Sequence, residues 1–107
     1  MRKKLNHILT LFIILVSHSL EAKPLIIIDP GHGGKDPGGH YGRYYEKKLA
    51  LDTALRTERI LRSKGYRTVM TRRKDVFLSL GQRTRLANRY GRNTCLLYTS
   101  PSPRDRG

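Results

Sequence analysis

The chain of 107 residues carries 22 lysines and arginines against 8 acidic residues, a formal net charge of +14, and a single cysteine. One cysteine excludes a scaffold of disulfides, and no stretch is apolar for the roughly 20 residues that a membrane-spanning helix needs. The positive charge indicates an anionic partner, although a solvated basic surface without a partner would have the same composition.

The first 22 residues have the features of a secretory signal peptide. Basic residues at positions 2–4 precede the apolar run Ile8–Val16, and small residues around Ala22 offer a cleavage site. An uncleaved anchor is the alternative. We expect export to the periplasm or the extracellular space. Export argues against nucleic acid as the anionic partner and favours cell-wall polymer or an anionic membrane surface.

A strand and a glycine-rich loop follow. The β-branched run within Lys23–Asp29 predicts a buried strand, and the loop Pro30–Tyr45 comes directly after it. Ligands of open α/β sheets bind past the carboxyl ends of strands, so His32 in this loop is a candidate for chemistry. Asp36 breaks both the Walker pattern and the dinucleotide-binding pattern, so a phosphate cradle fits poorly. A metal site with His32 as ligand and a structural turn with an exposed histidine both stay open.

The clearest helix spans Glu46–Lys64, where apolar residues recur at a spacing of three and four and Gly65 supplies a stop. Tyr66–Thr71 is typical of a second strand, so strand, helix and strand form a right-handed βαβ unit with parallel strands. The helix dipole favours a carboxylate in the first turn. Glu46 lies there, at the edge of the sheet where the His32 loop also lies. The spacing therefore allows one site that contains both side chains.

Two polar residues at strand ends have open alternatives. In one interpretation Asp29 orients the His32 loop without binding a ligand itself. In the other it accepts hydrogen bonds from N–H groups of the turn. Arg72 lies in a charged loop after the second strand, where it could hold a substrate carboxylate. Its alternative is an ion pair with Asp75 that fixes the turn.

The last third of the chain contains one more predicted helix and a tail. Ser79 is a suitable N-cap for a helix that continues toward Gly91. Residues 95–107 show no sustained periodicity, contain two prolines and resemble a translated sequencing adapter. We expect an artefactual or disordered tail after a natural sequence that is cut short near residue 94. A genuine flexible tail rich in serine and proline is the alternative.

Several of these motifs together resemble one enzyme family. They are the run IIIDPGHGGKDPGG at 26–39, Glu46-Lys47, the run GYRTVMTR at 65–72, Asp75, Leu80, Arg83 and Ala87-Asn88. This combination resembles the zinc-dependent N-acetylmuramoyl-L-alanine amidases, and in particular the catalytic domain of the bacterial cell-wall amidases that separate daughter cells. The resemblance covers residues 25–93.

The resemblance implies an α/β domain with an open, mostly parallel sheet and flanking helices, which is incomplete in this chain. It implies a zinc ion held by His32 and Glu46, and hydrolysis of the amide bond between N-acetylmuramic acid and L-alanine in peptidoglycan. The family's third ligand, a histidine, and its catalytic glutamate have no counterpart before Asn93. We therefore expect a fragment that is inactive by itself and marginally stable.

The predicted organisation is a signal peptide at 1–22, the N-terminal part of an amidase catalytic domain at 23–94 and the tail at 95–107. The middle segment has 17 basic and 6 acidic residues. This charge keeps an alternative function open, a secreted basic protein that binds the cell wall without catalysis. A nucleotide-binding domain is a third interpretation, which Asp36 weakens.

Overall fold

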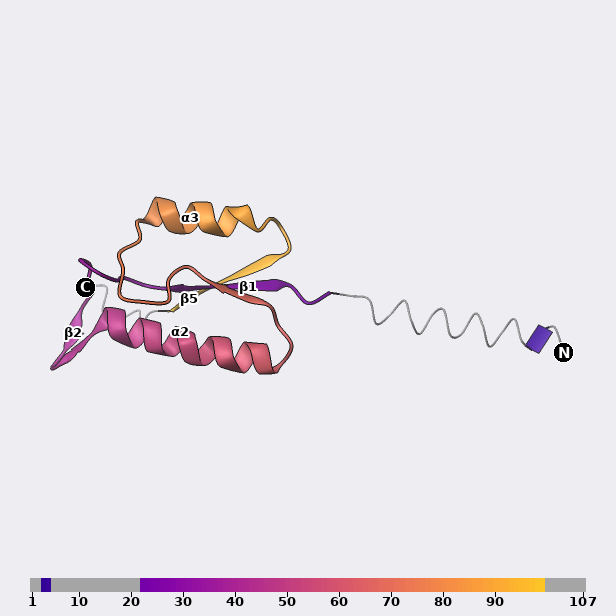
Figure 1. Ribbon diagram of the computed structural model, residues 1–107, viewed down its shortest axis with the longest axis horizontal. Helices are drawn as coiled ribbons and strands as arrows, with labels where there is room; N and C mark the ends of the chain where they lie inside the picture. Colours follow the sequence, from indigo (N-terminus) through magenta and orange to yellow (C-terminus); the bar gives the residue numbers. More distant parts are fainter. Residues whose placement is uncertain (1–2, 5–21, 100–107) are drawn as a thin grey trace.

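The computed structural model describes residues 3–4 and 22–99, and the predicted signal peptide lies almost entirely outside them. The elements in chain order are β1 Leu25–Pro30, β2 His40–Tyr41, β3 Tyr44–Tyr45, α2 Glu46–Ser63, β4 Thr68–Met70, α3 Leu80–Arg89 and β5 Thr94–Thr99. Figure 1 shows three layers, with α2 on one side of the sheet and α3 on the other. Within the described ranges, no helix combines the length and the apolar character that crossing a bilayer requires.

Strand β1 lies at the centre of the main sheet, whose described strands are parallel and have the order β4-β1-β5. Ile26–Ile28 pair with Thr68–Met70 on one side, and the whole of β1 pairs with Thr94–Thr99 on the other. Ile27, Ile28 and Pro30 are almost completely buried, because β1 has a neighbour along each edge. The predicted fold class, a parallel α/β sheet with flanking helices, is confirmed.

Helix α2 closely matches its predicted boundaries, since it begins at Glu46 and ends at Ser63. Ala50 and Ala54 are buried against the sheet, and their small side chains let the helix lie close to β1. The core that α2 covers consists of Ala54 together with Ile26, Ile28 and Met70. This packing holds the start of the helix, where Glu46 lies, next to the carboxyl end of β1.

Glu58 is the polar residue on the apolar stripe of α2, and the structure accounts for it. Its side chain is 8% exposed. Its two carboxylate oxygens lie 2.7 and 2.6 Å from Nη2 of Arg73, and Thr68 donates to it at 3.1 Å. An ion pair with a further hydrogen bond offsets the desolvation of this carboxylate. The contact joins α2 to β4 and to the loop after it.

Helix α3 starts at its predicted cap. Ser79 forms a capping box with Gln82, in which each side chain accepts a hydrogen bond from the other residue's backbone N–H. The helix ends at Arg89, and Arg83 is its one buried residue. An arginine on the buried side of a helix needs polar partners, and these lie in the site described below.

Strand β5 contradicts the prediction that residues 95–99 lack regular structure. Thr94–Thr99 runs parallel to β1 along the full length of that strand. The N–H and C=O groups along the edge of β1 form hydrogen bonds with this segment, whose leucine, tyrosine and threonine residues suit a strand. The exposure of this strand does not follow the apolar character of its residues. Leu96 and Tyr98 are half exposed, whereas Thr99 is buried and donates to an α2 carbonyl oxygen at 3.0 Å. Residues 100–107 of the predicted tail lie outside the described part.

Two further differences concern short strands. The predicted loop Pro30–Tyr45 contains a hairpin in which β2 and β3 pair antiparallel. Its side chains are all exposed, so no apolar alternation marks it in the sequence. Strand β4 covers only the centre of the predicted strand Tyr66–Thr71, although Thr71 still donates its N–H to the Ile28 carbonyl oxygen at 3.0 Å.

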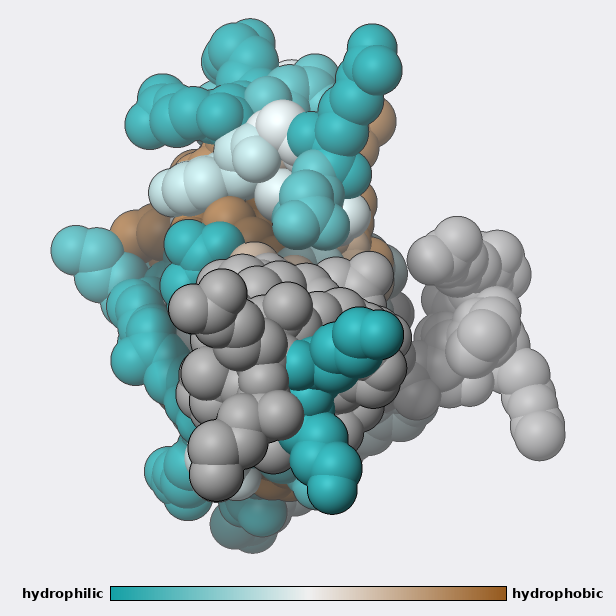
Figure 2. All heavy atoms as spheres, turned by 90° about the vertical axis from the view of Figure 1, so that its right-hand side faces the viewer, coloured by the Kyte–Doolittle hydropathy of each residue, from teal (hydrophilic) through white to brown (hydrophobic). Residues whose placement is uncertain are grey.

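Hydrophilic and hydrophobic side chains both lie on one face of the molecule. Figure 2 shows hydrophilic side chains around the grey atoms on the face that it draws, with hydrophobic atoms between them. Leu80 on α3 is 81% exposed and Leu96 on β5 is 57% exposed. Helix α3 therefore covers its face of the sheet less completely than α2 covers the opposite face.

We expect Ile28→Ala to be strongly destabilising, by about 2–5 kcal/mol, because it opens a cavity in the centre of the core. Ile28 is fully buried, whereas Ile60 on α2 is 56% exposed, so Ile60→Ala is the matched control. The control should change the free energy of unfolding by less than about 0.5 kcal/mol. Denaturant unfolding followed by circular dichroism measures both, and similar losses for the two variants would contradict the packing described here.

Candidate metal site

His32 lies two residues after the end of β1, in an unusual backbone conformation. Its φ is +59°, and among the described residues it is the one non-glycine residue with a positive φ. A side chain in the left-handed region costs on the order of 1 kcal/mol and is held there only where surrounding contacts impose it. Such strained positions cluster at functional sites, which draws attention to what surrounds His32.

Glu46 faces His32 across the loop. The distance from His32 Nε2 to Glu46 Oε1 is 3.1 Å, and Glu46 is 7% exposed at the first residue of α2. The second carboxylate oxygen of Glu46 accepts the Gly39 N–H at 2.9 Å. A Cβ at Gly38 would lie 2.7 Å from Glu46 Oε2 and 2.8 Å from His32 Cδ2, so glycine is needed for this close approach. The two side chains thus lie next to each other at the edge of the sheet where the sequence analysis expects them, and their role as metal ligands stays a prediction.

Asp36 forms a hydrogen bond with the other ring nitrogen of His32. Its Oδ2 lies 2.9 Å from His32 Nδ1, and its Oδ1 accepts the Gly38 N–H at 3.1 Å. Burial alone would raise the pKa of Asp36, but the hydrogen bonds from His32 and Gly38 outweigh it and hold this pKa below its usual value. An ionised Asp36 favours the tautomer that carries its proton on Nδ1 and has a lone pair on Nε2.

The pair of Nε2 and Glu46 fits a metal ion. With the Nδ1 proton directed at Asp36, a neutral His32 turns a lone pair toward a carboxylate at 3.1 Å. Two acceptors that close need a proton or a cation between them. Two tetrahedral zinc ligands with bonds of about 2.0–2.2 Å lie about 3.3 Å apart, close to the separation found here. Within residues 3–4 and 22–99 no three histidine, cysteine or acidic side chains form a metal-binding group. A full ligand shell therefore needs water or other ligands in addition.

Arg72 has a different environment from the one predicted. It is 3% exposed, and its guanidinium donates to the carbonyl oxygens of Pro30, Gly31, Lys47 and Lys74 at 2.7–3.2 Å. Burial and the nearby Arg83 lower the pKa of Arg72. Four of its five N–H groups thus serve the backbone, which gives no support to the predicted contact with a substrate carboxylate.

Arg72 does not form the alternative ion pair with Asp75 either. Asp75 instead accepts from Lys47 Nζ at 2.8 Å and from the Gly34 N–H at 2.8 Å. These hydrogen bonds lower the pKa of Asp75. The carboxylate therefore ties the glycine loop to the start of α2.

Arg83 is a site residue that the sequence analysis missed. It donates to Asp29 Oδ1 at 2.5 Å, to the Pro30 carbonyl oxygen at 2.6 Å and to the His32 carbonyl oxygen at 2.7 Å. The same Asp29 oxygen accepts from Thr71 at 2.6 Å. Asp29 thus orients the His32 loop, as one of its two predicted roles required, although it does so through Arg83. The available signal is an arginine at the spacing of an apolar helix position.

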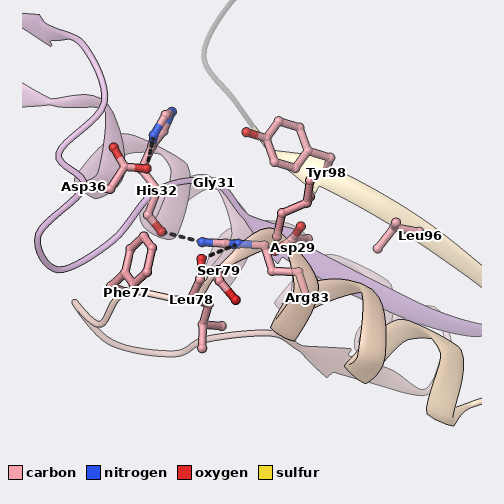
Figure 3. A pocket seen from close by; sticks show the side chains of 11 residues that line it. Asp29, Gly31, His32, Asp36, Phe77, Leu78, Ser79, Arg83, Leu96 and Tyr98 are labelled. Carbon is pink, nitrogen blue, oxygen red and sulfur yellow. Dashed lines mark hydrogen bonds and ion pairs between the residues drawn. The ribbon is translucent and has the colours of Figure 1, made fainter.

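A cavity of about 450 Å³ lies beside the loop. Figure 3 shows His32 and Asp36 at one end, Arg83 in the middle, and Leu96 and Tyr98 across from them on β5. The cavity brings apolar side chains to the neighbourhood of His32.

Comparisons with known proteins find similar sequences over most of the chain. Residues 26–97 match the sequence profile of the N-acetylmuramoyl-L-alanine amidases. The amidase AmiC of Neisseria meningitidis is 41% identical over 91 residues, which is 79% of this chain and 22% of that protein. The probable amidase AmiB of Haemophilus influenzae is 36% identical over 91% of this chain and 24% of that protein. The chain thus spans about a quarter of the length of these curated relatives.

Solved structures are similar as well. The amidase AmiC2 of Nostoc punctiforme superposes with a TM-score of 0.67 and 38% identity, over 74% of this chain and 44% of that chain. The catalytic domain of CwlV, an amidase from Paenibacillus polymyxa, gives a TM-score of 0.68 and 34% identity, over 74% of this chain and 45% of that chain. Each match thus covers about three quarters of this chain.

Proposed function

The chain belongs to the N-acetylmuramoyl-L-alanine amidase family, and from this premise we propose that it serves zinc-dependent hydrolysis of peptidoglycan. The bond cut is the amide between N-acetylmuramic acid and L-alanine of the stem peptide, during cell-wall remodelling or daughter-cell separation. The observation that carries the proposal is the contact between His32 Nε2 and Glu46 Oε1, with Asp36 bound to the Nδ1 atom of the same ring. A histidine and a carboxylate are ligands that catalytic zinc sites use.

Each residue of the site has a defined task in this proposal. His32 and Glu46 hold the zinc ion, which when bound supplies a Lewis acid and an activated water for attack on a carbonyl. Asp36 keeps the proton of His32 on Nδ1, so that Nε2 faces the ion. The Gly39 N–H engages one oxygen of Glu46 and so fixes the direction of the other.

We further propose that this chemistry takes place outside the cytoplasm. The basic and apolar pattern at residues 1–22 supports export, and the proposed substrate is itself a component of the cell wall. The chain covers just under half of the solved amidase structures that it resembles. The remaining ligand and the general base of the reaction would belong to the part of such a domain that residues 22–99 do not contain.

A segment exchange tests the proposal. Residues 25–93 replace the matching segment of the Neisseria AmiC relative, and dye-labelled peptidoglycan is incubated with the chimera and zinc. We expect release of dye together with new free amino groups of L-alanine. His32→Ala in the chimera should abolish both. Release of new reducing sugar ends without new amines, or release that survives His32→Ala, would overturn the proposal.

A second candidate function, wall binding without catalysis, is favoured by the charge of the surface. Each acidic side chain in residues 22–99 contacts a basic or imidazole group, as in the Asp52–Arg56 pair on α2. Exposed basic residues with no acidic contact in that part of the chain include Lys48, Arg59 and Arg85. Sedimentation with purified cell walls separates the two functions. A non-catalytic binder should bind walls equally well with and without the His32→Ala substitution, and should give a chimera that cuts nothing.

A further inference from the structure

We propose that Arg72 and Arg83 are positioning residues that together hold His32 in its strained conformation and at a fixed distance from Glu46. This inference deepens the proposed function, because it concerns the same metal site, but it rests on contacts that do not involve a metal. The two arginines come from different elements, the loop after β4 and helix α3. Both are buried, at 3% and 9% exposure.

The arginines bind three consecutive carbonyl oxygens of the loop. The Pro30 oxygen accepts from Arg83 at 2.6 Å and from Arg72 at 3.2 Å. The Gly31 oxygen accepts from Arg72 at 2.7 Å, and the His32 oxygen accepts from Arg83 at 2.7 Å. Because the peptide planes on both sides of the His32 Cα are held by guanidinium groups, its φ cannot relax to the usual negative range without breaking charge-assisted hydrogen bonds.

Arg72 also joins the two candidate ligands. The same Nη2 that binds the Gly31 oxygen binds the Lys47 oxygen at 2.9 Å. Gly31 directly precedes His32, and Lys47 directly follows Glu46. One guanidinium group therefore sets the separation between the backbones that carry the two side chains. Lysine, a point charge on a flexible stem, cannot reproduce this forked contact.

The guanidinium groups also form hydrogen bonds with groups outside the His32 loop. Arg83 is held by Asp29 at 2.5 Å and by the Leu78 oxygen at 3.2 Å, and Arg72 is held by the Lys74 oxygen at 3.1 Å. Neither guanidinium is therefore free to follow the loop. The loop adopts the shape that the arginines impose, which is the property expected of a support for a metal ligand.

The test uses the full chain with Arg83→Met, Arg83→Lys, Arg72→Lys and, as the matched control, Arg85→Met. Arg85 lies on the same helix as Arg83 and is exposed. Two measurements are made on each: the dissociation constant for zinc, by competition with a chromophoric chelator, and the NMR shifts of the His32 ring without metal. Circular dichroism reports whether the helices are retained.

We expect Arg83→Met to weaken zinc binding by about 10–100-fold and to shift the His32 ring resonances, since loss of outer-shell partners has effects of this size. The zinc affinities of the two lysine variants should lie between those of Arg83→Met and the wild type. Arg85→Met should match the wild type in both measurements. Should Arg83→Met fail to fold, the two lysine variants decide. Wild-type zinc affinity and unchanged His32 resonances in folded Arg83→Lys and Arg72→Lys would overturn the inference. If the wild type binds zinc no better than His32→Ala, the proposed metal site fails, and the His32 resonances still decide the role of the arginines.

Discussion

Replacing His32 with alanine should weaken zinc binding by the chain at least about 100-fold, more than the loss of a residue that merely supports a ligand. The side chain supplies Nε2, one of the two groups that lie 3.1 Å apart at the candidate site. Glu46 would remain with one oxygen bound to the Gly39 N–H and without the His32 nitrogen beside it. A single carboxylate does not retain zinc against a chelator. Competition with a chromophoric chelator measures the loss.

His40 provides the matched control for this experiment. It is also a loop histidine, but it lies in β2, is exposed and contacts the Tyr45 ring at 5.7 Å between centroids. His40→Ala should leave the zinc affinity within about twofold of the wild type, because surface substitutions away from a site have small effects. Equal losses in the two variants would show that zinc binds histidines of this chain without preference for the site.

The main features of this site follow from rules that act over short distances in the sequence. A buried strand followed by a glycine-rich loop predicts the place of His32, and the apolar spacing of α2 predicts its first residue, Glu46. In a parallel βαβ unit, the end of the first strand and the start of the helix share one edge of the sheet. These rules place both residues at one edge of the sheet and so allow a shared site, and the distance between the two side chains comes from the structure.

The supporting residues could not be found in the same way. Arg72 and Arg83 bind backbone carbonyl oxygens, and such acceptors exist at every residue, so the sequence does not show which oxygens the two arginines bind. Asp36 stands out in the sequence only as a residue that breaks two phosphate-binding patterns, although its carboxylate binds the His32 ring. Sequence patterns therefore predict the candidate ligands and miss the residues that hold them.

Strand β5 shows a different limit. Its burial pattern has exposed residues at four consecutive positions, so no alternation of apolar and polar residues distinguishes it from a tail. It becomes a strand because the edge of β1 lies beside it, and this long-range circumstance is absent from the local sequence. The same reason explains why Asp29 could be assigned two roles, since its partner Arg83 is 54 residues away.

The second large effect is expected from Gly33→Ala, which should cost more than about 3 kcal/mol of folding free energy or prevent formation of the loop altogether. Gly33 has φ +126°, a region that residues with a Cβ rarely adopt. An added Cβ would lie 2.1 Å from the carbonyl oxygen of Val76 and 2.9 Å from Nε of Arg72. The first of these atoms belongs to the backbone and cannot move aside cheaply.

Gly42→Ala separates the two causes of this cost. Gly42 also has a positive φ, +59°, but an added Cβ would meet no atom within 4 Å. We expect this variant to lose only the conformational term, about 1–2 kcal/mol, and to keep its zinc affinity. Gly33→Ala should lose affinity together with stability, because its clash displaces the loop between His32 and Asp36. Thermal unfolding and zinc titration of both variants test this, and a Gly33→Ala protein as stable as Gly42→Ala would show that the loop does not pack against Val76 and Arg72 as described.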